Sequence, residues 1–391
     1  MKKMTAMMLC AAMLLGLVVP VQAAEAQTDW EKAGFMQEPS VLPPVAEEGK
    51  LIAPVDKPEE GAKPISTVEE FLAARSGSWY LKNDLDLTGQ ALGIAPNGAL
   101  TIDGQGHKLT GLSAMLFRDR VSYDLTLRNL ILETAEGGVS AVALLMEACS
   151  GALKVDNCTV KADLMIPGSN GGGLVWDLNA NSRLTNCAFF GNLTADNTTA
   201  YVGGLAYTSG GTISGCVFSG TITNGKYLGG IAYGSGDVIR GCRVDGTMAP
   251  SFTGNSAGIA CAGIGTVEDC ISSMDGADCG IRLRGVVKNC VVDDAVLNGP
   301  GINYSGNVTD CTVRNSSCVG GGISGDNNST QTITGCLVEN CAITSTAKAG
   351  GIAQAANLIF RLCRQELHYY SCRRGRHCRR YRGGFPERLR R

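Results

Sequence analysis

From about residue 78 to residue 360, apolar and polar side chains alternate in short runs that Gly, Asn, Asp or Ser residues interrupt. Runs such as Thr212–Ser214, Cys216–Phe218 and Thr221–Thr223 change face at every residue, and this period of two predicts β-strands. No run carries an apolar helical pattern of about ten residues. The pattern therefore predicts an all-β domain and excludes ankyrin, tetratricopeptide and α/β repeats.

Two markers recur in alternation along this region and indicate an internal repeat. The first is a glycine directly before an aliphatic residue, at spacings of 21 to 31 residues: Gly173, Gly204, Gly230, Gly258, Gly280, Gly301, Gly322 and Gly351. The second is a cysteine preceded by Asn, Asp or Gly, at spacings of 20 to 29 residues: Cys158, Cys187, Cys216, Cys242, Cys270, Cys290, Cys311 and Cys336. Two markers that keep step through eight units predict a solenoid.

Units of this length with three short strands each are typical of the coils of a parallel β-helix, which stack at about 4.8 Å with apolar residues inward. Asn, Asp and Gly tolerate the left-handed backbone of a sharp turn, so the cysteine that follows each of them is expected to point inward. We interpret the eight cysteines as a structural ladder of small buried side chains. Disulfides between neighbouring coils and metal or redox chemistry are weaker alternatives, because the sequence contains no CxxC pair.

Looser strand-like segments precede the regular units. They are Trp79–Leu81 with Asp84–Leu87, Leu100–Gly104, and Leu125–Leu132, and they predict about three irregular coils. Ser66-Thr67 followed by Glu69-Glu70 has the pattern of a capping box and predicts a short helix. An open solenoid end exposes unpaired strands, so we expect this helix to cover it.

The stretches that begin at Val202 and Leu228 resemble the bacterial GLUG-motif repeat, and the segments around Trp79 and Thr101 resemble the coils that precede such repeats. The resemblance covers about residues 78–360. It implies a right-handed parallel β-helix solenoid, here of about eleven coils with the capping helix, on secreted or surface-attached bacterial proteins that are often adhesin-like. It implies no catalytic motif. The units from Cys261 to Cys318 depart from it, since they are shorter and lack the doubled glycine.

The N-terminus has the order of a secretory signal peptide: Lys2 and Lys3, an apolar run from Ala6 to Val19, then small residues. We expect cleavage near Ala23 and a secreted or cell-surface location, with no transmembrane segment. The predicted organisation is a signal peptide (1–23), an acidic proline-rich linker (24–65), the β-helix domain (66–360) and an Arg/Cys-rich tail (361–391). Within the domain we expect the cap at 66–76, irregular coils at 77–150 and GLUG-like coils at 151–360.

The tail changes how the charge of the chain is interpreted. It holds eleven arginines against Glu366 and Glu387, a charge of +9, whereas the 391 residues together carry −2, which leaves −11 for the rest. The tail can be a polyanion-binding arm, a membrane-surface segment or a frameshift product. Codons permitted from Phe360 onward, when read one nucleotide later, restore both repeat markers and place a cysteine 26 positions after Cys336. We therefore predict a frameshift near Ile359, a truncated product and no nucleic-acid partner.

Candidate catalytic residues are few, because His107 is the one histidine before the tail. Asp269 and Asp310 occupy equivalent turns two units apart, about 9.6 Å by the coil spacing. That separation is near the range for the two catalytic carboxylates of a glycosidase. However, the preference of Asp for sharp turns already accounts for Asp269 and Asp310. His107 itself lies in a glycine-rich segment that we interpret as a turn.

Two further acidic groups allow enzymatic chemistry on a β-helix. Asp293 and Asp294 are adjacent in sequence. Adjacent residues on a strand point to opposite faces, which argues against a catalytic pair. A lyase base at Arg282 or Arg284, with calcium held by Asp275 and Asp278, is chemically possible but carries no motif. We therefore predict no catalytic, metal or cofactor residues and leave the enzyme question open, with a non-catalytic protein favoured.

Binding has more support, since a stacked solenoid presents long faces of repeated side chains. Aromatic residues recur among them: Trp176, Tyr201, Tyr207, Tyr227 and Tyr233. They can stack on sugar rings, or Tyr207 and Tyr233 can stack on each other as a structural ladder. The sequence thus predicts an adhesin-like scaffold that interacts with glycans or host and cell-surface proteins, with a polysaccharide lyase or glycoside hydrolase as the alternative.

Overall fold

The computed structural model describes residues 39–118, 120–302, 306–324, 332–345 and 350–352. Beyond these it describes the backbone of short strands at 358–360, 363–364, 368–371 and 379–382. The predicted signal peptide (1–23) lies outside the described residues, and of the predicted frameshifted tail (361–391) only strand backbone is described. Both interpretations stay predictions.

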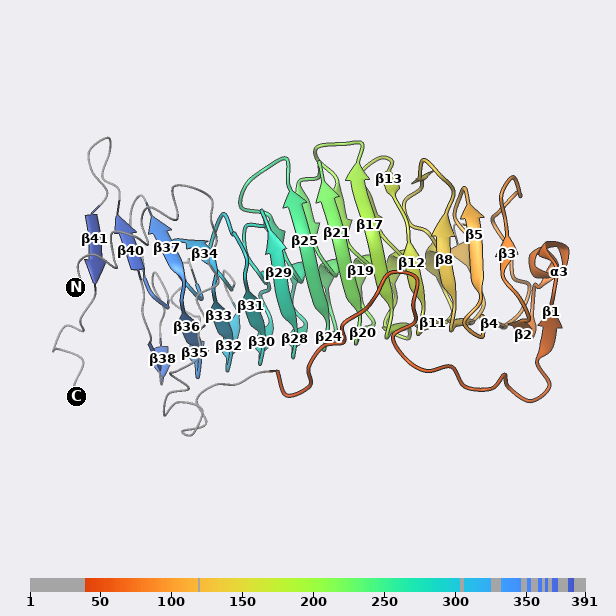
Figure 1. The fold of residues 1–391 in the computed structure, drawn as a ribbon, viewed down its shortest axis with the longest axis horizontal. Coiled ribbons are helices and arrows are strands. Elements are labelled where there is room, and N and C mark those ends of the chain that lie inside the picture. The colour runs from red at the N-terminus through yellow and green to blue at the C-terminus, as the bar shows by residue number, and fades with distance from the viewer. Residues whose placement is uncertain are drawn as a thin grey trace, which may run out of the picture. The chain divides into compact units, whose positions relative to one another are not determined.

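Two long parallel sheets run the length of the solenoid (Figure 1). The β2 sheet has 13 strands, in the order β1 (Lys63–Ile65), β2 (Gly77–Leu81), β4 (Leu100–Asp103), β7 (Leu125–Arg128), β11 (Leu153–Asp156), β16 (Arg183–Thr185), β20 (Thr212–Ser214), β24 (Val238–Arg240), β28 (Thr266–Glu268), β30 (Val286–Lys288), β32 (Asn307–Thr309), β35 (Thr332–Thr334) and β38 (Leu358–Phe360). Each strand pairs in parallel with the strand one coil away, as Leu184 does with Ile213. This arrangement confirms the predicted parallel β-solenoid.

The β5 sheet lies next along each coil and has 14 strands. They are β3 (Leu85–Asp86), β5 (Lys108–Leu112), β8 (Ile131–Thr134), β12 (Thr159–Lys161), β17 (Ala188–Ala195), β21 (Val217–Thr223), β25 (Arg243–Ala249), β29 (Ile271–Asp275), β31 (Val291–Asp293), β33 (Thr312–Arg314), β36 (Leu337–Glu339) and β39 (Cys363–Arg364), with β9 (Val139–Ser140) and β13 (Leu164–Ile166) beside them. The left-handed turn before each cysteine separates this sheet from the β2 sheet, and it occurs once in every regular coil.

The regular coils have four strands rather than the three that the sequence predicts. A β15 sheet holds β6 (Arg120–Val121), β10 (Met146–Cys149), β15 (Val175–Leu178), β19 (Ala206–Ser209), β23 (Ala232–Ser235) and β27 (Ala260–Gly263), and a β18 sheet holds β14 (Asn170–Gly172), β18 (Tyr201–Gly203), β22 (Tyr227–Gly229) and β26 (Ser256–Ala257). Two of the predicted strands, Cys216–Phe218 and Thr221–Thr223, form the single strand β21. The two strands on either side of the doubled glycine, such as β18 and β19, were not predicted.

The shorter coils after β27 lose these two sheets in the part of the chain that the structure describes. Isolated bridges replace the strands, between Ala257 and Cys279 and between Ile281 and Ile302. The last short sheet comprises β34 (Ser317–Val319), β37 (Ala342–Ser345), β40 (His368–Ser371) and β41 (Arg379–Arg382). The two long sheets continue regardless, so the repeat persists where the sequence resemblance is weakest.

One hydrophobic core fills the solenoid from the first coil onward. Side chains at equivalent positions stack along it, as the buried Phe189 and Phe218 do with ring centroids 5.7 Å apart. Such columns give each coil a large contact with its two neighbours and almost none with distant coils.

The predicted cap is present as helix α3 (Val68–Ala73) at the first end of the stack (Figure 1). Thr67 Oγ1 accepts from the Glu70 amide at 3.2 Å, and the Glu70 carboxylate accepts from the Thr67 amide, which completes the capping box. Phe71 is fully buried against the first coil. The helix therefore covers the open core as the sequence predicts.

The segment predicted as the end of a linker differs from that expectation. Residues 63–65 form β1, which pairs with β2. Residues 39–62, here called the strap, follow the outside of the solenoid in hydrogen-bond contact with its coils (Figure 1, red to orange). Proline and acidic content predicts an extended backbone, but it does not show where the polar groups of that backbone find partners.

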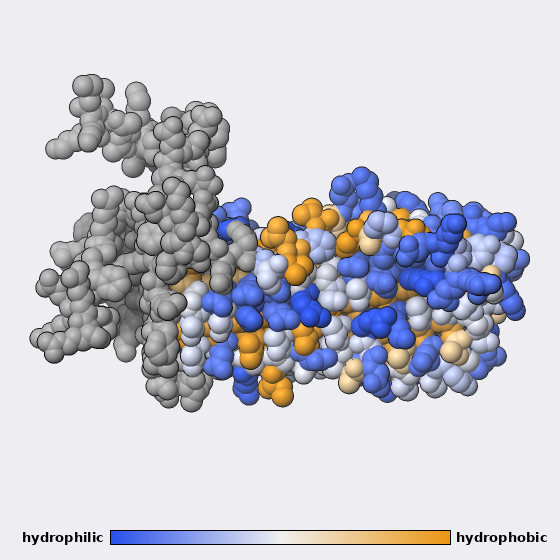
Figure 2. Space-filling model, turned by 90° about the horizontal axis from the view of Figure 1, so that it is seen from below, coloured by the Kyte–Doolittle hydropathy of each residue, from blue (hydrophilic) through white to orange (hydrophobic). Residues whose placement is uncertain are grey.

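No helix among the described residues is long and apolar enough to cross a membrane. One long face of the solenoid is largely hydrophilic, with hydrophobic side chains in separate spots rather than in a continuous area (Figure 2). That face offers no broad apolar docking surface.

Candidate binding face

The repeat glycines lie in a column at the corner between the β18 and β15 sheets. A Cβ atom added to Gly204 would lie 1.8 Å from the Gly230 carbonyl oxygen, and one added to Gly230 would lie 1.9 Å from that of Gly258. The preceding glycine of each pair is equally restricted, since a Cβ on Gly203 would lie 1.8 Å from the Ala206 oxygen. Only glycine allows this corner.

The corner brings two columns of aromatic side chains together. Tyr201 and Tyr227 pair across β18 and β22, while Trp176, Tyr207 and Tyr233 follow one another across β15, β19 and β23. These five rings form the aromatic platform, and each is half-buried. The sequence identified all five residues, but not that the two columns meet.

The rings contact one another both along and across the columns. Tyr207 and Tyr233 stack with centroids 5.4 Å apart and planes 5° from parallel, and Trp176 lies 5.3 Å from Tyr207. Tyr201 lies 5.1 Å from Tyr233 and meets Tyr227 edge-on at 4.8 Å. The stacking of Tyr207 on Tyr233 that the sequence suggested is therefore present. The rings are only partly buried, so they still face solvent.

Burial and the neighbouring rings govern the electrostatics of the platform. Burial, with smaller effects from the charges of neighbouring ionisable groups, raises the pKa of Tyr233 to about 12. Burial also raises the pKa of Tyr207. The hydroxyls thus stay protonated and able to donate hydrogen bonds well above neutral pH. At the rim, Lys226 Nζ lies 5.3 Å from the Tyr227 ring and 5.9 Å from the exposed Phe252 ring.

An open groove of about 370 Å³ adjoins the platform. Its lining includes the residues that follow the aromatic column, Asp177 and Thr208, together with Gly234 and Gly236. The Thr208 hydroxyl donates to the Asp177 carboxylate. Asp177, Thr208 and Gly234 occupy equivalent positions of β15, β19 and β23, and the missing side chain at Gly234 leaves space at that coil.

Sequence reasoning missed the groove and the role of Asp177. The available signal was the position after the aromatic residue in each unit, where Asp177 and Thr208 are followed by Gly234, which has no side chain. Reading that signal requires the register between coils, which only the strand pairing defines.

The eight ladder cysteines lie inside the solenoid, at most 1% exposed. The amide of Cys187 donates to Cys216 Sγ at 3.4 Å, and the amides of Cys242 and Cys290 make the same contact with the next cysteine of the column. The thirteen cysteines whose side chains the structure describes are all free thiols and buried. Outside the ladder, burial raises the pKa of Cys261 to about 12 and of Cys341 to about 11.

The residues before the ladder cysteines take the backbone conformation expected from sequence. Asn157, Asn186, Asp269, Asn289 and Asp310 all have φ between 50° and 54°. The three remaining turn residues are glycines with positive φ, namely Gly215, Gly241 and Gly335. Asn and Asp supply a side chain at this column that glycine lacks.

The carboxylates weighed as catalytic are held in structural contacts. Asp269 Oδ1 accepts from the Ser40 amide and hydroxyl, at 2.9 and 2.6 Å. Asp278 is almost fully buried, and its Oδ2 accepts from the amides of Asn255 and Ser256 and from the Ser256 hydroxyl. Asp275 accepts from the Val296 amide. In each of these carboxylates one oxygen thus accepts hydrogen bonds from the fold itself.

The remaining candidates are also held by neighbouring groups, and Arg282 lies beside Cys261, the residue that follows Tyr233 in the aromatic column. Arg282 Nη1 donates to the Cys261 carbonyl at 3.1 Å, and Asp293 pairs with Arg314 at 2.9 Å. His107 Nδ1 lies 3.1 Å from Asp84, at a half-exposed turn. Among the described residues no group of three or more His, Cys, Asp or Glu side chains is arranged to hold a metal ion.

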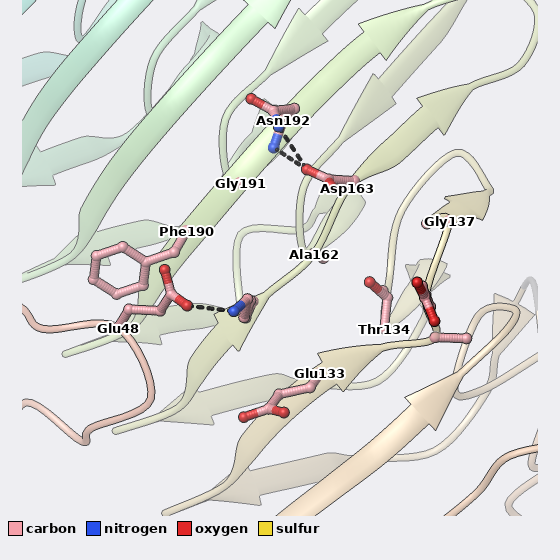
Figure 3. A pocket seen from close by; sticks show the side chains of 13 residues that line it. Glu48, Glu133, Thr134, Gly137, Ala162, Asp163, Phe190, Gly191 and Asn192 are labelled. Carbon is pink, nitrogen blue, oxygen red and sulfur yellow. Dashed lines mark hydrogen bonds and ion pairs between the residues drawn. The ribbon is translucent and has the colours of Figure 1, made fainter.

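A second recess, of about 460 Å³, lies between the strap and the β5 sheet (Figure 3). Glu48 of the strap forms an ion pair with Lys161 of β12 at its edge. Asn192 donates its amide and Nδ2 to Asp163, at 2.9 and 2.7 Å, and Phe190 lines the recess. The strap therefore supplies part of the wall of this recess.

No family model and no curated protein matches the chain. Among solved structures, a Bacteroides ovatus protein described as an immunoglobulin A1 protease is 14% identical, with a TM-score of 0.31 over 78% of this chain and 85% of that one. An IgA1 protease is 13% identical (TM-score 0.30), over 78% of this chain and 22% of that protein. The catalytic domain of a GH87 α-1,3-glucanase in complex with tetrasaccharides is 14% identical (TM-score 0.31), over 80% and 70% of the two chains. These values assign no role to any residue of the platform or groove.

Proposed function

We propose that the chain is an interaction scaffold that binds glycans on the aromatic platform and in the groove beside it. The observation that carries this proposal is the set of five half-exposed rings on adjacent coils, next to an open groove. Aromatic rings offer sugars an apolar surface, and the few polar groups around them fix orientation.

The groove favours a neutral glycan over an acidic one. Asp177 and Thr208 are hydrogen-bond partners for sugar hydroxyls, and the groove-lining residues include no lysine or arginine. A uronate or sulfate group would face the Asp177 carboxylate without a compensating cation. The glycines among the lining residues let a sugar ring approach the backbone closely.

A binding role fits this face better than hydrolysis. Glycoside hydrolysis uses two carboxyl groups about 5–9.5 Å apart. Of the residues that line the groove, Asp177 alone carries a carboxylate. The polysaccharide lyase or glycoside hydrolase alternative therefore finds no pair of catalytic groups on this face.

Secretion and surface attachment belong to the same proposal. The signal-like N-terminus supports export, and the resemblance to GLUG-motif repeats supports an adhesin-like role on a bacterial surface. A solenoid suits such a role because it displays one repeated face over a long distance.

The test is binding of neutral oligosaccharides, first on a glycan array and then by calorimetry. Trp176→Ala removes the ring at the end of the aromatic column, and we expect at least a ten-fold loss of affinity, since an interface aromatic contributes more than about 1.4 kcal/mol. Tyr123→Ala is the matched control, because Tyr123 is exposed and lies outside the platform. Wild-type affinity of Trp176→Ala, or no glycan binding by the wild-type chain, would contradict the proposal. Release of reducing sugar would instead support the enzyme alternative.

A further inference from the structure

The solenoid holds the strap chiefly through the main chain of the strap. The Ala53 amide donates to Asn157 Oδ1 at 2.8 Å, and Asn157 Nδ2 donates back to the Ala53 carbonyl at 2.9 Å. The amide side chain of a turn residue thus binds one strap residue as a neighbouring strand would. Asn157 Nδ2 also donates to Asn129 Oδ1, which fixes the orientation of the amide.

Three more contacts repeat this mode. The Thr159 hydroxyl donates to the Lys50 carbonyl at 2.6 Å, and Gln105 Nε2 donates to the Asp56 carbonyl at 3.0 Å. The Ser40 amide donates to Asp269 Oδ1 at 2.9 Å. Side chains of the solenoid therefore form hydrogen bonds with the main chain of the strap at four residues.

Several apolar side chains of the strap are exposed to solvent rather than packed on the solenoid. Val41, Leu42 and Val45 are 62–77% exposed. The strap also contains Pro43, Pro44, Pro54 and Pro58, which favour an extended conformation that loses little entropy on docking. The main-chain contacts and the prolines together favour an extended segment on this face.

Charge adds a preference for acidic segments. Glu48 pairs with Lys161, and Glu59 Oε1 lies 3.0 Å from Arg128 Nη1. Arg128 is the more buried cation, and its Nε also binds Asp103 at 2.8 Å. The two cations of the solenoid contact the strap on either side of Ala53, so an acidic segment is held in one register.

We propose that the face beneath the strap is a binding surface for an extended acidic polypeptide, and that its second occupant is the strap of another copy of this chain. Exchange of an identical segment between copies forms the same contacts and needs only a pivot in the connection. The strap joins β1 through a turn at Glu60-Gly61, where Gly61 has φ of 82°, a conformation that supplies such a pivot. Exchanged straps link solenoids side to side.

The experiment frees the face within the full chain and supplies the strap as a peptide. Ala53→Pro removes the amide hydrogen that Asn157 accepts, and Glu48→Gln with Glu59→Gln removes both ion pairs, while the solenoid surface stays unchanged. A fluorescent peptide of residues 45–60 is then titrated by anisotropy. We expect this triple variant to bind it at least ten-fold more tightly than the wild-type chain, whose own strap competes at high effective concentration.

Two substitutions on the solenoid separate recognition from folding. Asn157→Gly, added to the triple variant, removes the amide but keeps the left-handed turn, and we expect at least a ten-fold loss of peptide affinity. Asn186→Gly is its match, since Asn186 occupies the equivalent turn with φ of 50° against 52°, and we expect unchanged affinity. No saturable binding by the triple variant, or equal binding after Asn157→Gly, overturns the binding surface.

The second copy is tested with wild-type chains alone. Chains labelled on the strap with a donor and chains labelled on the solenoid with an acceptor are mixed and incubated. Energy transfer that grows with time and disappears with unlabelled peptide supports exchange. If the peptide binds but no energy transfer develops, the proposal that the strap of another copy occupies this face is wrong.

Discussion

From Gly173 to Gly322, the repeat glycines occupy points where the carbonyl oxygen of the next coil, or a side chain beside it, leaves no room for a Cβ atom. The same contact recurs from Gly173, whose added Cβ would lie 2.1 Å from the Gly204 oxygen, to Gly322, at 2.3 Å from the Gly351 oxygen. The glycine is thus required by packing between coils, and it is also what turns Tyr201 toward Tyr207. One residue type serves both the fold and the candidate binding face.

Gly204→Ala is expected to destabilise the protein by about 3 kcal/mol, because the clashing atom is backbone and cannot rotate away. Gly210→Ala is the control, since its nearest neighbours would lie at 3.5 Å, an ordinary contact. Urea unfolding followed by circular dichroism measures both. Equal stability of the two variants would contradict the packing role of the glycine column.

Tyr233 is expected to make the free energy of unfolding decrease at alkaline pH. Its pKa in the folded protein, about 12, exceeds the value of about 10 for an unfolded chain. The resulting stabilisation is complete below pH 10 and is lost as the pH rises from 10 toward 12. Unfolding free energies measured at pH 8, 10 and 11 are expected to fall more steeply for the wild type than for Tyr233→Phe. Parallel curves would exclude Tyr233 as a source of the alkaline loss.

At the scale of elements, the strands begin and end at turns that single residues determine. Asn157 and Asn186 predict the corner between the two long sheets because each adopts positive φ. The corner at the doubled glycine was invisible as a turn, because Tyr201–Ser209 keeps an apolar pattern across it. Alternation therefore predicted the existence of strands better than their number in each coil.

The capping helix is the element that its local sequence, the capping-box pattern, was sufficient to predict. Thr67→Ala removes the acceptor for the Glu70 amide, and we expect a loss of about 1 kcal/mol in unfolding free energy. Ser66→Ala, one residue earlier and outside the cap, is expected to stay within about 0.5 kcal/mol of wild type. Thermal unfolding compares the two, and an equal loss in both would show that the cap does not depend on the Thr67 side chain.

At the scale of the whole molecule, stability is a sum over neighbouring coils rather than a property of one centre. Phe218→Ala removes the ring that stacks on Phe189 and leaves a cavity in the core. We expect it to lower the free energy of unfolding by about 3–5 kcal/mol. The loss should be local. Hydrogen exchange followed by mass spectrometry is expected to accelerate in β17, β21 and β25 but not in β4 or β7. Uniform acceleration along the chain would contradict a nearest-neighbour solenoid.

The sequence by itself determined the solenoid, its inward cysteines and its left-handed turns. These features depend on one residue type at one position in each unit, and local backbone preference is enough to define them. Repetition then reveals them, because a signal that is weak in one coil recurs in eight. The five platform residues could be named for the same reason.

Only the tertiary structure decided which of these residues meet. The register between coils placed Asp177, Thr208 and Gly234 in one line, where they line the groove. Contacts between residues about a hundred positions apart, such as Ala53 with Asn157, placed the strap on the solenoid. Composition describes how extended a segment is, but the partners of its backbone depend on surfaces that exist only after the coils have stacked.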